Sequence, residues 1–265
     1  MQNNISNSRL CRCCYGAIHP IFKGSLIGHS VDYFECSTCG YVQTDTPHWL
    51  EQAYVDAINV SDTGIMSRNQ ANARIVLLTL MLLGKLDGTL VDCAGGYGIL
   101  VRLLRDFGIN ALWSDSYCQN LLAKGFERTT EKADLVTAFE AFEHFVNPAE
   151  ELNRLLDIAP NVLFSTELIA NPAPQQDDWW YYGKNHGQHI GFFKVKTLEK
   201  LAKEHGKFLA TNNTSYHLMT DKPVNQTLWK NMIRVNRLIP LFLKRSLVSK
   251  VWSDHNLMVR RTSII

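Results

Sequence analysis

The sequence predicts an α/β protein in which a doubly wound parallel sheet follows a small cysteine-rich head. Two observations carry this prediction: short apolar strands alternate with amphipathic helices after residue 85, and five of the seven cysteines lie within the first 39 residues. With 265 residues, of which 46% are hydrophobic, the chain can bury one large core and a small appendage. We expect a head over 1–45, a helical cover over 46–85, and the main domain over 86–265 with a helical insert near 223–250.

The head contains two C-x2-C knuckles. Cys11 and Cys14 form the first, and Cys36 and Cys39 form the second, with 21 residues between them. Four thiolates are the donor set that structural Zn²⁺ prefers, since a closed tetrahedral site leaves no position for water. A head of this size cannot build much of a core, so the predicted role of the metal is to hold its turns together.

Other ligands and another role for the head stay open at this point. Cys13 could replace Cys14, and His19 or His29 could replace one sulfur, because spacing does not show which side chains converge. The cysteines could also be reduced and buried without a metal. Zinc ribbons also bind nucleic acid, but "YGAIHPIFKGSLIGHSVDYF" between the knuckles has one lysine and no arginine, so it offers few charges to phosphates.

The main domain is expected from a regular alternation of elements. A helix over 61–83 would bury Ile75, Leu78 and Leu82 against the front of the core. Pro148 after Asn147 is typical of a helix start. The elements expected next are a strand over 86–93, a helix over 99–107, a strand over 109–115, a helix over 118–124, a strand over 133–139, a helix from 148 and a strand over 161–168. Sheets of this kind bind ligands beyond the carboxyl ends of their strands.

A glycine cluster, "AGGYG", lies on the turn between the first strand of this series and its helix. Dinucleotide-binding turns have the pattern G-x-G-x-x-G, but here Gly98 is followed by "ILV", so the third glycine is missing. The G-K-[ST] of a phosphate-binding P-loop does not occur in the sequence. The turn therefore predicts that a ligand approaches bare backbone closely, but it does not predict a phosphate site.

The stretch "VDCAGGYG" resembles motif I, D-x-G-x-G-x-G, of the class I S-adenosylmethionine-dependent methyltransferases. Asp92, Gly96 and Gly98 are in register with the motif, and Ala94 occupies its first glycine position. The resemblance implies a seven-stranded Rossmann-like sheet whose glycine loop passes beneath the methionine part of the cofactor. It also implies that an acid at the end of the second strand, here Asp115, binds the ribose hydroxyls.

A second segment, "FEAFEHFVNP", resembles the E-H-x-x-x-P segment that follows the fourth strand in many small-molecule methyltransferases. Phe139 and Tyr97 could flank the adenosine or the sulfonium, and Arg68 could pair with the cofactor carboxylate. Plain core positions and a solvated arginine are the alternatives. The predicted cofactor-binding residues are Asp92, Ala94, Gly96, Tyr97, Gly98, Asp115, Phe139 and Arg68.

Most of residues 11–200 is similar to a zinc-headed methyltransferase family of bacterial sugar and polysaccharide biosynthesis. The similarity lies in "CRCC", "YFECSTCGYVQTD", "SDTGIMSRNQAN" and "DWWYYGKNHGQHIGFF". Sugar C-methyltransferases of that family carry a sizeable third domain, whereas few residues follow Thr211 here. O-methylation of a sugar hydroxyl, on a sugar nucleotide or a surface glycan, is therefore expected. The alternatives are C-methylation of a keto-sugar, O-methylation of another small molecule, and a zinc-ribbon scaffold without catalysis.

A general base would assist such a reaction, because a sugar hydroxyl is almost un-ionised at neutral pH, and histidine is the usual choice. We expect His144 to be this base because it follows the fourth strand, close to where the transferable methyl group should lie. Alternatively, His144 only hydrogen-bonds nearby backbone, while Glu143 contacts substrate or holds the helix start.

The loop "DDWWYYGKNHGQH" contains the other candidate residues for the acceptor side. His186 and His189 could act in base chemistry, in substrate binding or in ordering the loop. Trp179 and Trp180 could stack on a sugar ring, since aromatic faces beside polar groups suit it, or they could pack under the sheet. The predicted catalytic group is His144, His189, His186 and Glu143.

Charge and hydropathy bear on partners and location. The net charge of +2, without a long run of lysine and arginine, gives little indication of a nucleic-acid partner, and the family resemblance implies a small-molecule carbohydrate substrate instead. The polar N-terminus has no signal-peptide core, and the longest apolar stretch, Ile75–Leu83, is too short to span a bilayer. We therefore expect a cytoplasmic protein without a transmembrane segment, whose oligomeric state the sequence does not decide.

Overall fold

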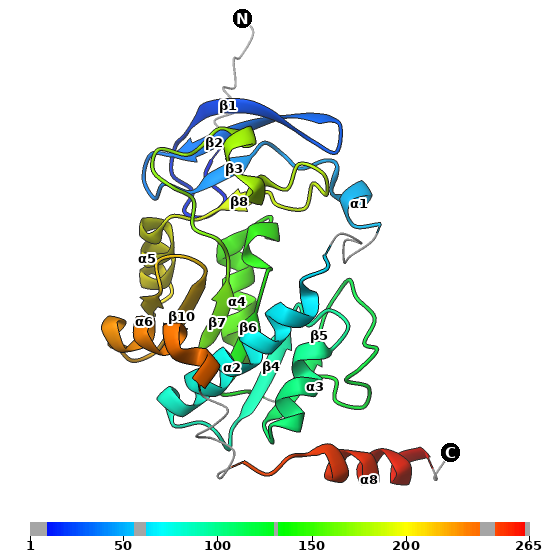
Figure 1. The fold of residues 1–265 in the computed structure, drawn as a ribbon. Coiled ribbons are helices and arrows are strands. Elements are labelled where there is room, and N and C mark those ends of the chain that lie inside the picture. The colour runs from blue at the N-terminus through cyan, green and yellow to red at the C-terminus, as the bar shows by residue number, and fades with distance from the viewer. Residues whose placement is uncertain (1–9, 56–61, 130–131, 239–246, 263–265) are drawn as a thin grey trace, which may run out of the picture.

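The computed structural model describes residues 10–55, 62–129, 132–238 and 247–262. Its elements are, in chain order, β1 (Ile18–Leu26), β2 (His29–Cys36), β3 (Val42–Thr44), α1 (Leu50–Ala53), α2 (Ile65–Leu83), β4 (Thr89–Cys93), α3 (Ile99–Asp106), β5 (Asn110–Ser114), β6 (Leu135–Ala138), η1 (Phe142–His144), α4 (Pro148–Ile158), β7 (Val162–Ser165), η2 (Gln176–Asp178), η3 (Trp180–Tyr182), β8 (Gly191–Phe192), α5 (Val195–Glu204), β9 (Phe208–Thr211), β10 (Tyr216–Thr220), α6 (Gln226–Val235), η4 (Asn236–Leu238) and α8 (Val251–Thr262). They form a six-stranded sheet, β5-β4-β6-β7-β10-β9, and a four-stranded sheet, β1-β2-β3-β8. Figure 1 shows the smaller sheet above the larger one.

The larger sheet is doubly wound, as predicted. Along its strands, Leu90 and Leu135 enter one core, while the neighbouring Val91 and Val136 enter the other. Helices α2, α3 and α6 pack on the first face, and α4 and α5 on the second. The predicted α/β fold is therefore confirmed. The sheet is mixed and not wholly parallel, because β10 is antiparallel to both β7 and β9.

Within the described residues, the sheet has six strands and not the seven that the family resemblance implied. The seventh strand would lie beside β5. A single parallel bridge between Trp113 and Glu127 occupies that position. Glu127, Arg128 and Thr129 are polar and exposed. This edge segment has no apolar face to bury, so side-chain packing does not extend the pairing.

The helix predicted over 118–124 is wrong. These residues form turns, in which the Ala123 N–H donates to Asn120 Oδ1 at 2.9 Å. The Leu122 N–H donates to the carbonyl oxygen of Tyr97 at 3.0 Å, outside the segment. An asparagine that bonds its own following backbone competes with helix formation. The hydrogen bonds to the glycine loop thus determine the conformation of this segment, and its apolar pattern does not.

The head extends past the expected boundary at residue 45 to include α1 and Tyr54, because Trp49, Leu50 and Ala53 pack in its core. It combines two distant parts of the chain. Strands β1, β2 and β3 pair antiparallel in sequence order, and β8 then pairs with β3, with Val42 opposite Phe192. Tyr33 and Trp49 are buried in the head core, and the Trp49 indole donates to the Gly187 carbonyl at 2.8 Å. The head is therefore fastened to the segment between η2 and β8.

The C-terminal region has two parts: α6 lies beside the larger sheet, and α8 lies at the opposite end of the main domain from the head (Figure 1). In the predicted helical insert, α6 buries Trp229 against the first core, while residues 239–246 lie outside the described part of the chain. Beyond it, α8 is held by Asp254, which accepts hydrogen bonds from Arg102 and Arg105. Among the described helices, none combines the length and the hydrophobicity needed to cross a membrane.

Candidate active site

A cleft of about 1470 Å³ lies at the carboxyl ends of β4, β5 and β6. The glycine loop over 94–98 forms part of one wall, and the head contributes Leu50 and Tyr54 to another. The segment from Gln176 to His189 also borders it. The cleft thus lies where parallel α/β sheets bind their ligands, between the main domain and the head.

Three residues of the glycine loop have left-handed backbone. The φ angle is 62° at Ala94, 52° at Gly96 and 86° at Gly98. A Cβ on Gly98 would lie 2.9 Å from the Cβ of Ala123, which is too close. Glycine is therefore needed at this position because the segment around Ala123 packs directly against its backbone. Ala94, Gly96 and Tyr97 line the cleft, whereas Gly98 does not.

Ala94→Gly is expected to raise the free energy of unfolding by about 0.5–1 kcal/mol. An alanine in the left-handed region is strained by roughly 1–2 kcal/mol, and glycine relieves this strain while adding about 0.4–1 kcal/mol of unfolded-chain entropy. Urea unfolding measures the change. Ala149→Gly, inside α4, is the control and should lower the same free energy by up to about 1 kcal/mol. A loss of stability in both variants would contradict strain at Ala94.

Asp115 directly follows β5 and joins the glycine loop to the next turn. Its Oδ2 accepts from the Gly96 N–H at 2.9 Å, and its Oδ1 accepts from the N–H groups of Tyr117 and Cys118 at 2.7 and 2.8 Å. Three backbone donors fix the carboxylate, while Oδ2 keeps a lone pair for a further donor. Because the side chain borders the cleft, this lone pair can accept a hydroxyl of a bound ligand.

Asp92 is buried near the end of β4 and also borders the cleft. Its Oδ1 accepts a hydrogen bond from Thr137 Oγ1 at 2.6 Å. Burial raises the pKa of this carboxyl to about 7, and the negative charge of Asp115 acts in the same direction. The carboxyl of Asp92 therefore titrates near neutral pH.

The remaining predicted cofactor residues all border the cleft but differ in their surroundings. Arg68 is paired with Asp62. Phe139 is largely buried and packs edge-on against Tyr216, with ring centroids 6.2 Å apart. Tyr97 is 36% exposed, so its ring is open to a ligand. Phe139 is thus a core residue at the margin of the cleft, and Arg68 is not simply solvated.

Four predicted catalytic residues come together beside the cleft. One donor atom from each of Glu143, His144 and His189 lies within 4.8 Å of the others. The ring centroid of His186 lies 4.6 Å from that of His189. We call Glu143, His144, His186 and His189 the histidine cluster. Two separate loops supply it: η1 after β6, and the segment before β8.

Second contacts orient two of the rings. His144 Nδ1 lies 2.7 Å from the Tyr54 hydroxyl, and His189 Nδ1 lies 2.6 Å from the Tyr181 carbonyl oxygen. A carbonyl oxygen only accepts, so His189 Nδ1 carries the ring proton and Nε2 carries the lone pair. Burial lowers the pKa of His144 to about 3 and that of His189 well below its usual value. Both rings are therefore neutral at pH 7.

Glu143 is the most enclosed member of the cluster. It is fully buried, and neither carboxylate oxygen meets hydrogen-bond geometry among the described residues, although Tyr181 and Thr166 lie close enough to lower its pKa. Its Oε1 lies 3.9 Å from His144 Nε2. Burial raises the pKa of this carboxyl to about 8, and the charge of Glu140 adds to the effect. Leaving a buried acceptor unpaired costs on the order of 1–3 kcal/mol, so the position suits a donor or a cation.

The two tryptophans of the loop have different environments. Trp180 is 78% exposed at the margin of the cleft. Trp179 packs edge-on against Tyr182 and Phe192, both with ring centroids within 5.7 Å. Trp180 is therefore accessible for stacking, whereas Trp179 mainly contributes to the head core.

The sequence did not predict the part played by two tyrosines. The Tyr54 ring stacks on Tyr117 with centroids 5.0 Å apart and an angle of 19°, while its hydroxyl contacts His144. Tyr54 follows α1 in the head, and Tyr117 follows β5 in the main domain. No local spacing connects them, so only the docking of the head reveals this wall of the cleft.

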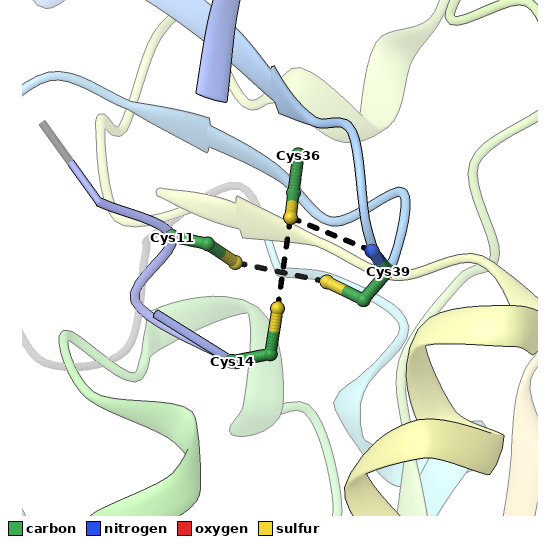
Figure 2. A group of neighbouring side chains, drawn as sticks. All are labelled: Cys11, Cys14, Cys36 and Cys39. Atoms are coloured by element: carbon green, nitrogen blue, oxygen red, sulfur yellow. Dashed lines mark hydrogen bonds between the residues drawn. The ribbon is translucent and has the colours of Figure 1, made fainter. Parts of the chain in front are cut away.

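In the head, the cysteines of the two knuckles converge on one point (Figure 2). The Sγ atoms of Cys11 and Cys39 are 3.6 Å apart, as are those of Cys14 and Cys36. Two sulfurs on one tetrahedral Zn²⁺ are about 3.8 Å apart, whereas disulfide sulfurs are about 2.05 Å apart. The four thiols therefore fit a zinc ion. The alternative ligands Cys13, His19 and His29 lie outside this group.

Comparison with known protein families identifies a methyltransferase domain in this chain. The sequence profile of a family described as a methyltransferase domain matches residues 67–207, slightly more than half of the chain. The matched range contains the glycine loop, Asp115 and the histidine cluster. A search of curated proteins finds no match.

Solved structures also align with the chain. An O-methyltransferase family protein from Burkholderia thailandensis matches with a TM-score of 0.40 and 12% identity, over 62% of this chain and 62% of that one, so less than two thirds of its length is spanned. Magnesium protoporphyrin IX methyltransferase from Synechocystis PCC 6803, with bound S-adenosylhomocysteine, matches with a TM-score of 0.40 and 16% identity over 64% and 90% of the two chains. A plantazolicin methyltransferase matches with a TM-score of 0.41 and 11% identity over 65% and 89%.

Proposed function

The chain belongs to the methyltransferase domain family and is an S-adenosylmethionine-dependent methyltransferase, and we propose that it methylates a hydroxyl of a sugar, on a sugar nucleotide or a surface glycan. The observation that carries this proposal is that the segment from Gln176 to His189 borders the same cleft as the glycine loop. The segment offers the exposed indole of Trp180 together with amide, ammonium and imidazole groups. Such a wall suits a ring that has an apolar face and several hydroxyls.

The cofactor would lie along the glycine loop. When bound, S-adenosylmethionine supplies a methyl group on a positively charged sulfur. The free lone pair on Asp115 Oδ2 would accept a ribose hydroxyl, and the accessible Tyr97 ring would lie beside the cofactor. Arg68 would offer a cofactor carboxylate those N–H groups that do not face Asp62.

The acceptor hydroxyl would lie between the glycine loop and the histidine cluster. Methyl transfer is an in-line displacement, so the walls of the cleft must align the acceptor oxygen and exclude water. His144 and His189 border the cleft with neutral rings, so either can accept a hydrogen bond from the acceptor hydroxyl. The specific role of His144 as free base stays a prediction.

Asp115→Ala is expected to weaken binding of S-adenosylhomocysteine by about 1–3 kcal/mol. The substitution removes a charged acceptor for the ribose and the anchor of the Gly96 N–H. Isothermal titration calorimetry measures the affinity. Asp87→Ala, an exposed site outside the cleft, is the control and should bind normally. An unchanged affinity in Asp115→Ala would place the ribose elsewhere.

A panel of sugar nucleotides and phenols, each incubated with the protein and S-adenosylmethionine, tests the acceptor class. Mass spectrometry would detect methylated products, and NMR would show whether the new methyl group is bonded to oxygen or carbon. We expect an O-methyl sugar. Methylation confined to phenols, or a methyl group bonded to a ring carbon, would overturn the proposed reaction.

We further propose that Cys11, Cys14, Cys36 and Cys39 hold a structural Zn²⁺. The sulfur separations support this assignment, and a closed four-thiolate site has no position for a reacting ligand. The ion would stiffen the head that presents Tyr54 to the cleft. Its contribution to the reaction would therefore be the shape of the acceptor wall.

A further inference from the structure

We propose that Glu143, His144 and His189 bind a second metal ion, a divalent transition metal such as Zn²⁺ or Fe²⁺, at the margin of the cleft. The donor atoms of these three side chains lie within 4.8 Å of one another. Two imidazoles and one carboxylate are a set that such ions use where they keep positions open for other ligands.

The first independent support is Glu143. Its side chain is fully buried, and neither carboxylate oxygen reaches hydrogen-bond geometry with a described residue, the nearby Tyr181 and Thr166 included. Its Oε1 lies 3.9 Å from His144 Nε2, which is too far for a hydrogen bond and near the spacing of two ligands around one ion. A cation between them would hold this buried carboxyl in its ionised form and supply the ligand bond that its neighbours do not.

The second support is the orientation of the two imidazoles. His189 donates its Nδ1 proton to the Tyr181 carbonyl oxygen, which leaves the Nε2 lone pair for a ligand bond. His144 Nδ1 faces the Tyr54 hydroxyl, and with Nε2 on an ion it would donate its proton to that oxygen. Metal-binding histidines generally use their other ring nitrogen in this way.

The third support is that the two supplying loops are fixed to each other. The Ile190 N–H donates to the Glu143 carbonyl oxygen at 2.9 Å, which joins η1 to the segment before β8. Of the three proposed ligands, His144 and His189 border the cleft. An ion held by them would therefore direct its open positions toward the acceptor.

If the proposed function is correct, the ion would activate the acceptor. Coordination lowers the pKa of a bound hydroxyl, so its O–H bond would break and the proton would pass to solvent water before methyl transfer. The oxygen would then form a bond to the methyl carbon as the carbon–sulfur bond breaks, and the sulfur would keep that electron pair. His144 would thus act as a ligand and not as a free base.

Cobalt binding tests the site without any activity assay. Tag-free, zinc-loaded protein would be treated with a weak chelator, which leaves the thiolate site filled, and then titrated with Co²⁺ alone. We expect one further equivalent of Co²⁺, with visible bands of nitrogen and oxygen ligands and without intense thiolate charge-transfer bands. Elemental analysis would count both metals.

Four variants assign the ligands. Glu143→Gln and His189→Ala should abolish the cobalt signal, whereas Tyr54→Phe should weaken cobalt binding by about 10-fold to 100-fold. His255→Ala, on the exposed face of α8, is the control and should bind as the wild type does. Thermal unfolding would verify that each variant is folded.

The inference would be overturned if the zinc-loaded wild-type protein bound no cobalt. It would also be overturned if cobalt binding persisted in both Glu143→Gln and His189→Ala. These results do not depend on the acceptor. Methylated sugar from a protein without the second ion would leave the proposed function standing and refute the site alone. Cobalt bound at the site, with no methylated sugar in the acceptor panel, would support the metal site and refute the proposed function.

Discussion

His144→Ala is expected to lower the turnover number at least about 100-fold while affinity for S-adenosylmethionine stays within about twofold. The ring borders the cleft and is fixed by the Tyr54 hydroxyl at 2.7 Å, so its removal takes away the best oriented imidazole at the acceptor. The loss follows whether this ring takes the proton itself or holds an ion. The glycine loop and Asp115 are separate from it, so cofactor binding should persist.

Single-turnover methyl transfer and calorimetry would measure these two quantities for His144→Ala. His255→Ala should match the wild type in both, because His255 is exposed on α8 and does not border the cleft. Near-normal turnover in His144→Ala would exclude the residue from the reaction. Equal losses of turnover and cofactor affinity would indicate a collapsed cleft and not a missing functional group.

Cys14→Ser is expected to release the zinc and lower the free energy of unfolding by more than about 3 kcal/mol. A structural zinc ion contributes its binding energy to folding, and the small head has little other core near the knuckles. Loss of the ion should also reduce turnover, because Tyr54 reaches His144 from the head. Elemental analysis and thermal unfolding would measure the two primary effects.

Cys13→Ser is the matched control for this prediction. Cys13 is adjacent in sequence and buried, but it lies outside the group of four thiols. We expect it to retain zinc and to lose about 1 kcal/mol of stability at most, as a minor change in packing. If zinc were retained in Cys14→Ser and lost in Cys13→Ser, the proposed ligand set would be wrong, and Cys13 would replace Cys14 as the ligand.

The parts of the fold that could be predicted are those in which a local pattern has one stable solution. The alternation of strands and helices from β4 to β7 follows from side-chain periodicity, and both faces of the sheet are buried as predicted. Two short-range predictions were less reliable. The helix over 118–124 is absent because that backbone bonds to Tyr97, and the edge beyond β5 is reduced to one bridge.

Most residues predicted for the candidate site border one cleft, but their geometry was not predictable. The motif predicted a glycine turn that a ligand approaches closely, yet only the structure shows that Ala94, Gly96 and Gly98 have positive φ and that Gly98 is packed against Ala123. The histidines lie on separate segments, and nothing in their spacing indicated that they would meet at Glu143. The unpaired carboxylate is likewise invisible until its neighbours are known.

By itself, the sequence determined the α/β class, the methyltransferase family and the presence of two C-x2-C knuckles, because each depends on residue types at short, regular spacings. Tertiary structure alone decided that β8 completes the head sheet, that Tyr54 crosses from the head to His144, and that Glu143 is enclosed beside two imidazoles. The physical reason is that these contacts join residues far apart in the chain. Their free energies depend on how the head docks on the sheet, which no local pattern contains.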